Sequence, residues 1–177
     1  FAFIFSAKLI CFSIRPPFQC SRGLVKDAHR DAALRAHKFF DNLNVLHDCG
    51  LLLEVNADQV SYNTVIHAYQ RSKLPNAGEE AESLLNMLQS LYESSGDPSL
   101  RPDVVTYCSL LGVHANTGNA RRAEDLLLQF HKEHTMHPDR AAPDTACLDQ
   151  VLLAWARKGG EQGAKRANML LKLMEVC

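Results

Sequence analysis

The sequence lacks the features of several protein classes. Of its 177 residues, 19 are Lys or Arg and 20 are Asp or Glu, so the formal net charge is -1. This balance argues against a protein that holds nucleic acid mainly by bulk positive charge. No apolar run approaches the roughly 20 residues of a membrane-spanning helix, so we predict no membrane span.

The motifs of the common catalytic and metal sites are also missing. Six cysteines are present, but no two have C-x-x-C spacing, and no Cys/His set has zinc-finger spacing. They are typical of free thiols in a reducing compartment. G-x-S-x-G, H-E-x-x-H and G-x-x-x-x-G-K-[ST] are all absent. We therefore expect no enzymatic activity, no cofactor and no bound metal.

Three histidines at three-residue spacing, His131, His134 and His137, are the nearest approach to a metal site. On a continuing helix, His131 and His134 would share a face and could bind a metal. Pro138 and the loop-forming residues around it predict instead that the helix has already ended. We assign no metal site to this segment.

Residues 1–26 contain no acidic residue and carry Lys8, Arg15, Arg22 and Lys26 among several serines. This composition is typical of an organelle transit peptide. The competing interpretations are a secretory signal with residues 1–5 in its apolar part, a disordered leader and an ordinary first helix. The transit-peptide interpretation predicts a mitochondrial or chloroplast protein.

Beyond this segment, two kinds of sequence block alternate. The first kind reads DQVSYNTVI from Asp58, DVVTYCSLL from Asp103 and DTACLDQVL from Asp144, so it recurs after 45 and then 41 residues. The second kind begins at Ala81, Ala123 and Ala167, and a fainter copy occupies 36–43. Self-similarity at such a period indicates a repeat architecture.

Each block is predicted to be an amphipathic helix. Apolar residues fall at i, i+3, i+4 and i+7 in the first kind (Tyr62, Val65, Ile66, Tyr69) and in the second kind (Ala123, Leu126, Leu127, Phe130). Asp58 and Asp103 precede their helices and suit the N-cap position. Period-2 alternation is absent, so we expect no strands.

Paired helices of this kind bury their apolar faces only when the pairs stack, which gives an all-α fold, an α-solenoid of antiparallel helical hairpins. The predicted repeat domain spans 27–177, with repeats at about 59–103, 104–144 and 145–177 and a partial repeat before 58. The turn between helices is predicted at Gly118-Asn119 in the middle unit. Longer turns are expected at 72–78 and 159–163 in the outer units.

The segment Pro102-Asp103-Val104-Val105-Thr106-Tyr107, followed by Gly118 and Ala123-Glu124-Asp125-Leu126-Leu127, resembles the pentatricopeptide repeat. The run from Val60 to Ile66 resembles the first-helix signature of that family still more closely. The resemblance covers roughly 28–177. Family units are usually about 35 residues long, and here the surplus falls at 92–100 and 131–142. We expect these insertions to lengthen loops.

The resemblance implies binding of single-stranded RNA, with each repeat presenting a few side chains to one unstacked base. A polar residue on the first helix and another just before the next repeat would contact the base edge, and an apolar residue near the helix start would pack on the base face. Carried over by position, these residues are Val60, Asn63 and Asp103 in one unit, Val105, Cys108 and Asp144 in the next, and Ala146 and Asp149 in the last.

In this family an Asn–Asp pair goes with a pyrimidine, preferentially uracil, so the resemblance assigns that preference to Asn63 and Asp103. Cys108 is a weak hydrogen-bonding group, and we expect little base choice there. These residues have structural alternatives: the aspartates as helix caps alone, Asn63 as a solvated helix residue, and Val60 and Val105 as core.

Three basic pairs, Arg121-Arg122, Arg157-Lys158 and Lys165-Arg166, would either line one side of the groove and meet phosphates or form a solvated helix face. Trp155 is predicted to pack in the core. The expected function is RNA binding in organelle RNA processing, stability or translation, with other RNA-processing proteins as further partners. The alternative is a helical-repeat scaffold for protein–protein interaction.

Overall fold

The computed structural model describes residues 24–48, 57–72, 74–139 and 141–174. Within them the chain forms seven α-helices and one short 3-10 helix, and no strand. The helices are α2 (Leu24–Asp48), α3 (Gln59–Ser72), α4 (Ala77–Ser95), α5 (Val104–Thr117), α6 (Ala120–Met136), α7 (Thr145–Lys158) and α8 (Gly160–Met174), with η1 at Pro98–Leu100.

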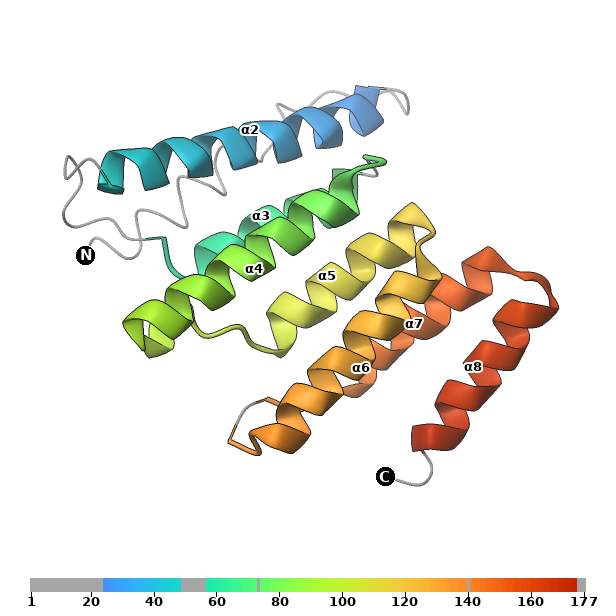
Figure 1. The fold of residues 1–177 in the computed structure, drawn as a ribbon. Helices are drawn as coiled ribbons and strands as arrows, with labels where there is room; N and C mark the ends of the chain where they lie inside the picture. Colours follow the sequence, from blue (N-terminus) through green and yellow to red (C-terminus); the bar gives the residue numbers. More distant parts are fainter. Residues whose placement is uncertain (1–23, 49–56, 73, 140, 175–177) are drawn as a thin grey trace.

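The helices stack in two layers, as the repeat pattern predicted (Figure 1). The first-type helices α3, α5 and α7 pack side by side in chain order. Each second-type helix packs on the first-type helix of its own hairpin, and α4 and α6 also contact the first-type helix of the next hairpin. The all-α fold of stacked antiparallel hairpins is therefore confirmed.

The core lies between the layers and is built from the predicted apolar stripes. Val65, Leu110 and Val151 are each the seventh residue of their helix, and all three are fully buried. Helix α2 extends this core, because Phe40 packs its ring edge-on against Tyr62 with centroids 4.5 Å apart. The faint block at 36–43 thus belongs to a helix that covers α3.

The expectation that the surplus residues lengthen loops is correct for only part of them, since 96–100 lie outside the α-helices whereas 92–95 and 131–136 lie within them. Helices α3, α5 and α7 have 14 residues each, whereas α4 has 19 and α6 has 17. Much of the surplus therefore continues the second-type helices, which project beyond their partners. Helix α4 ends where Gly96 adopts the left-handed conformation, with φ of 67°. Because α6 continues to Met136, His131 and His134 lie on this helix and not in a loop.

The predicted turn at 159–163 is also wrong, because α8 begins at Gly160, directly after Gly159. Gly163 lies inside α8, where an added Cβ would stand 2.7 Å from the carbonyl oxygen of Trp155. This glycine therefore marks a close approach of two helices. The turn at Gly118-Asn119 is confirmed, with Gly118 at φ 81° and Asn119 as the N-cap of α6.

The predicted leader lies mostly outside the described residues. Helix α2 begins at Leu24, inside the segment 1–26. In the part of the chain that the structure describes, no helix combines the length and the apolar character needed to cross a bilayer.

A buried polar cluster recurs at each step of the stack. The eleventh residue of each first-type helix is Tyr69, His114 or Trp155, all about 2% exposed. Each of them contacts a polar side chain from the preceding second-type helix. Tyr69 hydrogen-bonds His37, His114 Nε2 lies 3.0 Å from Glu82 Oε1, and Trp155 Nε1 donates to Glu124 Oε2 at 3.0 Å.

All three clusters continue to a third helix, and in the first of them His37 Nδ1 lies 3.9 Å from Glu80 Oε2 of α4. Arg122 of α6 donates to both carboxylate oxygens of Glu82, at 2.8 and 2.6 Å, and Arg166 of α8 donates to Glu124 at 3.3 Å. Each cluster therefore joins one first-type helix to the second-type helices on both sides of it. This arrangement sets the spacing between units with directional contacts as well as with apolar packing.

The cluster at His114 predicts a pH dependence of stability. Burial lowers the pKa of His114 below its usual value of 6.5. The unfolded chain then takes up this proton more readily than the folded chain, so the free energy of unfolding should fall as pH drops from about 7.5 to about 5.5. This window lies above the titration of Glu82, whose pKa the Arg122 hydrogen bond lowers.

His114→Gln, which cannot take up this proton, should show a smaller loss over the same window in urea denaturation. His131→Gln, at an exposed position on α6, is the matched control and should keep the dependence of the unchanged chain. Equal pH dependence in all three proteins would contradict the assignment to His114.

Candidate functional site

The second and fifth residues of the first-type helices form a surface on the side of α3, α5 and α7 that faces away from the core. We call it the first-helix surface. Val60 and Val105 are 54% and 57% exposed, so they are not core residues. Residues three apart share one face of a helix, which places the remaining members beside them. The full set is Val60, Asn63, Val105, Cys108, Ala146 and Asp149.

The predicted aspartates cap the first-type helices. The Asp103 carboxylate accepts the backbone N–H of Thr106 at 2.9 Å. The Thr106 hydroxyl in turn accepts the backbone N–H of Asp103 at 3.3 Å, which completes a capping box. Asp58 accepts the backbone N–H of Ser61, and Asp144 that of Cys147, both at 2.9 Å. The N-cap predictions are therefore confirmed.

Asp103 also contacts the preceding unit. Asn63 of α3 donates from Nδ2 to Asp103 Oδ1 at 3.4 Å, although the two residues are 40 positions apart in the sequence. The carboxylate is an acceptor only, so this contact orients the amide with Nδ2 toward Asp103. Asn63 Oδ1 then points elsewhere, and it is buried with no hydrogen-bond partner among the described residues.

The next unit brings Cys108 to the corresponding place. Burial, followed by the charge of Asp144, raises the pKa of the Cys108 thiol, so the thiol keeps its proton near neutral pH. Asp149 and Cys147 also lie near this thiol. The position therefore offers a weak donor between two carboxylates. Ala146 and Asp149 occupy the same positions in α7 and are exposed.

A second polar row crosses the carboxyl-terminal halves of the first-type helices, and the sequence reading missed most of it. Arg157 of α7 donates to Asn116 Oδ1 at 2.6 Å and to the Ala115 carbonyl at 3.1 Å. Asn116 in turn donates to the Gln70 carbonyl at 2.7 Å. The signal in the sequence was the spacing, since 46 and 41 residues separate the members of this row, close to the repeat length.

Gly112 of α5 makes room for this row. An added Cβ there would lie 2.0 Å from Gln70 Nε2 and 3.1 Å from Gln150 Oε1. The side chains of Gln70 from α3 and Gln150 from α7 therefore both extend over Gly112 of α5. Their amide groups lie between the capping aspartates at the amino-terminal ends of the first-type helices and Arg157 near the carboxyl-terminal end.

The structure separates the three predicted basic pairs. Arg157 lies in the row described above, but Arg122 and Arg166 form ion pairs with Glu82 and Glu124 of the second-type helices. Lys158 lies over the Trp155 ring, 5.0 Å from its centroid. Trp155 itself is buried, which confirms its predicted packing role. The basic pairs do not line one side of a shared groove.

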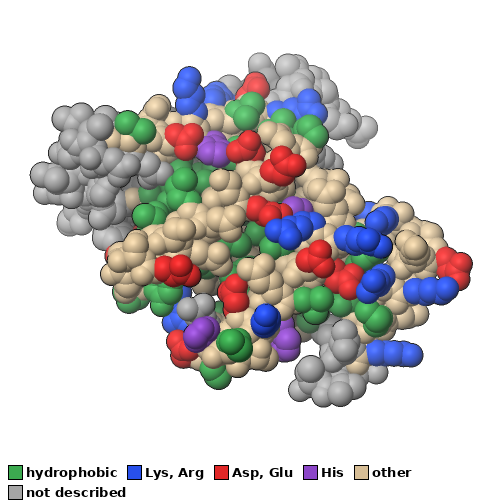
Figure 2. Space-filling model, viewed as in Figure 1, with side chains coloured by type: hydrophobic (Ala, Val, Ile, Leu, Met, Phe, Trp, Pro, Cys, Tyr) green, Lys and Arg blue, Asp and Glu red, His purple; other side chains and the backbone are tan. Residues whose placement is uncertain are grey.

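The face seen in Figure 2 carries acidic and basic side chains interspersed with one another. It includes the second-type helices α4 and α6, as the matching view in Figure 1 shows. Interspersed charges of both signs give no continuous positive track for a phosphate backbone. In the described residues, no group of three or more His, Cys, Asp and Glu side chains is arranged to hold a metal ion.

Comparison with known proteins finds a family match for the middle of the chain. Residues 91–140 match the family model of the pentatricopeptide repeat domain. This segment contains η1, α5 and α6, so it is one complete hairpin with the end of the helix before it. No curated protein and no solved structure matches the chain.

The two roles of Asp103 can be separated by substitution. Asp103→Ala removes the cap of α5 and should lower the free energy of unfolding by about 1 kcal/mol. Asp103→Asn keeps an acceptor oxygen for the backbone and should cost much less. Urea denaturation of the two variants checks this difference. Equal losses would mean that the negative charge of Asp103, and not its capping hydrogen bond, stabilises α5.

Proposed function

Because the chain carries a pentatricopeptide repeat, and proteins of this family generally bind RNA, we propose that it binds a short single-stranded RNA segment along the first-helix surface. The observation that carries this proposal is the contact between Asn63 and Asp103. It brings together a polar residue of one unit and the capping residue of the next, beside the exposed Val60. A helix cap alone has no need of Asn63.

The geometry at Asn63 suits a pyrimidine. Uracil presents an N3–H donor between two carbonyl acceptors, and a primary amide can donate and accept at once. Asp103 holds Asn63 Nδ2, so Oδ1 is the atom left to accept. A buried acceptor without a partner is costly, and a small rotation of the side chain would let it accept the N3–H of uracil. This chemistry supports the uracil preference of the pair.

Val60 supplies an apolar surface for the face of the same base, and Val105 does so in the next unit. Both side chains are exposed at the start of their helices, a position that apolar packing within the fold does not require. In proteins that bind single strands, stacking of a base on aromatic rings contributes about 1–3 kcal/mol, and contact with valine contributes less. We therefore propose that hydrogen bonding decides base choice and that apolar contact adds affinity.

The phosphate backbone would run toward the opposite end of the first-type helices. Arg71 in the last turn of α3 and Arg157 in the last turn of α7 are exposed there. Asp103, Asp144 and Asp149 gather at the other end, where they would repel phosphates. Few cations are available, so we expect weak binding by this chain with strong salt dependence.

Pentatricopeptide repeat proteins are typically non-enzymatic, and we propose a binding role without catalysis for this chain. Holding a single strand would protect the RNA, expose part of it or recruit other RNA-processing proteins. The basic, acid-free segment 1–26 supports a place in organelle RNA metabolism, in a mitochondrion or chloroplast. The RNA that the chain binds would determine whether it serves RNA processing, stability or translation.

The proposal predicts a preference for single strands. In filter binding at low salt, the chain should retain a single-stranded uridine-rich oligomer better than a duplex of the same length. The first-type helices present their residues to unstacked bases, and a duplex hides those base edges. Equal retention of both would overturn base reading. Retention of neither would favour the alternative of a helical-repeat scaffold for a protein partner.

Asn63→Ala should lower affinity for a uridine oligomer by roughly fivefold, the loss expected for one hydrogen bond, and leave affinity for an adenosine oligomer nearly unchanged. Asn86→Ala is the matched control, because Asn86 is exposed on α4 in the other layer. Circular dichroism should show unchanged helix content in both variants. If Asn63→Ala and Asn86→Ala bind both oligomers alike, Asn63 does not read the base.

A further inference from the structure

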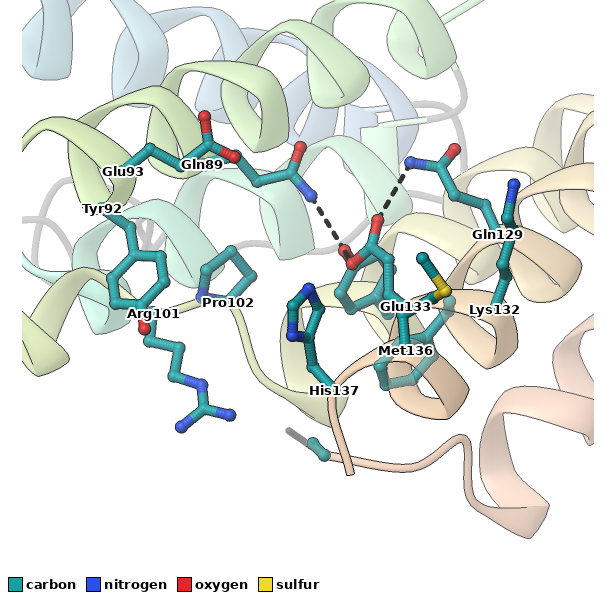
Figure 3. Close-up of a pocket in the computed structure, with 13 residues that line it drawn as sticks. Gln89, Tyr92, Glu93, Arg101, Pro102, Gln129, Lys132, Glu133, Met136 and His137 are labelled. Carbon is teal, nitrogen blue, oxygen red and sulfur yellow. Dashed lines mark hydrogen bonds between the residues drawn. The ribbon is translucent and has the colours of Figure 1, made fainter. Parts of the chain in front are cut away.

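A cavity of about 410 Å³ lies between the carboxyl-terminal parts of α4 and α6 (Figure 3). It exists because these two helices project beyond the first-type helices, so their ends flank a space with the first turn of α5 beneath. Tyr92 and Glu93 of α4 and Lys132, Glu133 and Met136 of α6 wall it, and they belong to the segments by which the units exceed the usual repeat length. Its volume falls within the range of small-molecule sites.

Two stacked aromatic rings form the floor of the cavity. Tyr107 of α5 and Phe130 of α6 stack with ring centroids 4.0 Å apart, and each is 3% exposed. Tyr92 and Pro102 lie on one side, and Met136 and His137 on the other (Figure 3). A flat ring entering between these sides would meet aromatic and apolar surfaces.

A chain of hydrogen bonds crosses the cavity and leaves acceptors for a ligand. Gln89 donates to the Tyr107 hydroxyl at 2.9 Å, Tyr107 donates to Glu133 Oε2 at 2.8 Å, and Gln129 donates to Glu133 Oε1 at 3.1 Å. Each carboxylate oxygen has two lone pairs, so both oxygens of Glu133 can accept a further N–H. The carboxylate is held in place by two donors before any ligand arrives.

Charged side chains of both signs line the cavity, because Glu93 and Glu133 face it together with basic residues. This lining suits a ligand that carries both an anionic group and N–H donors. Arg101 and Lys132 line the cavity from different segments. Arg101 Nη2 donates to the carbonyl oxygen of Asp139 at 2.8 Å and lies 3.4 Å from the Asp139 carboxylate, so this residue holds the guanidinium beside the opening. A nucleotide combines a flat ring, N–H donors and a phosphate. A basic protein side chain would be attracted by the carboxylates but would leave Arg101 and Lys132 without an anionic partner.

We propose that this cavity binds a guanine nucleotide and that Glu133 reads the base. Guanine presents two adjacent N–H donors, at N1 and N2, that match the two oxygens of one carboxylate. Uracil presents a single N–H, and adenine and cytosine present an amino group beside a ring acceptor, which the carboxylate would repel. The base inserts between the Tyr92 and His137 sides, and its phosphate meets Arg101 or Lys132.

The cavity is separate from the first-helix surface. Tyr107 stands roughly 200° around α5 from Val105, so the two sites open on different sides of the helix. The two sites are adjacent in the sequence, because Pro102 of the cavity wall directly precedes Asp103. The nucleotide could therefore be a free mononucleotide or a guanosine of a bound RNA that passes the edge of α5, and the experiment distinguishes the two sources.

Isothermal titration of the full chain at low salt with GMP, IMP, AMP, CMP and UMP tests the proposal. GMP should bind with saturation and most tightly, and IMP, which lacks the N2 amino group, should bind more weakly. Glu133→Gln should weaken GMP binding by about tenfold, the effect of losing a charged acceptor. Glu161→Gln, an exposed carboxylate on α8, should leave GMP binding unchanged.

Oligomers identify the source. Placing one guanosine in a uridine oligomer should strengthen binding in the unchanged chain but not in Glu133→Gln if the ligand is part of the RNA. If GMP binds and the guanosine has no effect, the ligand is a free nucleotide. Both outcomes support the proposal that the cavity binds guanine. Binding of the plain uridine oligomer is read separately and reports on the first-helix surface alone.

Two results would overturn the proposal. One is the absence of both saturable GMP binding and any guanosine effect in the oligomer. The other is saturation by N-acetyl-argininamide in place of nucleotides, which would show a site for a basic protein side chain. If Glu133→Gln has reduced helix content by circular dichroism, Tyr92→Leu replaces it, and it should weaken GMP binding about fivefold through loss of ring stacking.

Discussion

Burial of one stripe on each first-type helix determines the rest of the structure. The seventh residues of α3, α5 and α7 are fully buried, and the eleventh residues form the polar clusters with the second-type helices. With those positions inside, a period of 3.6 residues turns the second and fifth positions outward on every unit. Side-by-side packing of the three helices then aligns these positions across the stack.

The same packing gives the charged and polar side chains of the two layers different partners. The second-type helices use their cations and carboxylates for one another, as the pairs of Arg122 with Glu82 and Arg166 with Glu124 show. The first-type helices keep amides, thiol and carboxylates on their outer side, with few ion pairs between them. A surface with polar groups at a regular spacing suits recognition of a linear polymer, one unit for each step.

Periodic features of the structure were predictable from the sequence. The apolar stripes, the N-cap aspartates and the turn at Gly118 follow from local rules that each block repeats. The lengths of α4 and α6 were not predictable from the repeat length alone. A surplus between two helices fits a longer helix as well as a longer loop, and only the cap at Gly96 and the packing of 131–136 decide between them.

The polar clusters escaped sequence analysis for a different reason. Their central residues are tyrosine, histidine and tryptophan, which share no chemical type, and their partners on the preceding helix lie 31 or 32 residues away. Only the equal position within each helix unites them. The contact of Asn63 with Asp103 was anticipated through the family resemblance, since no local rule connects residues 40 positions apart.

Photo-crosslinking shows whether the first-helix surface holds the RNA bases, as we propose. A uridine oligomer with a single 4-thiouridine would be irradiated with the full chain, and the modified peptides would be mapped by mass spectrometry. Bases held on this surface should give crosslinks in the first turns of α3 and α5, around residues 60–63 and 105–108. Crosslinks confined to α4, α6 and α8 would contradict the proposal.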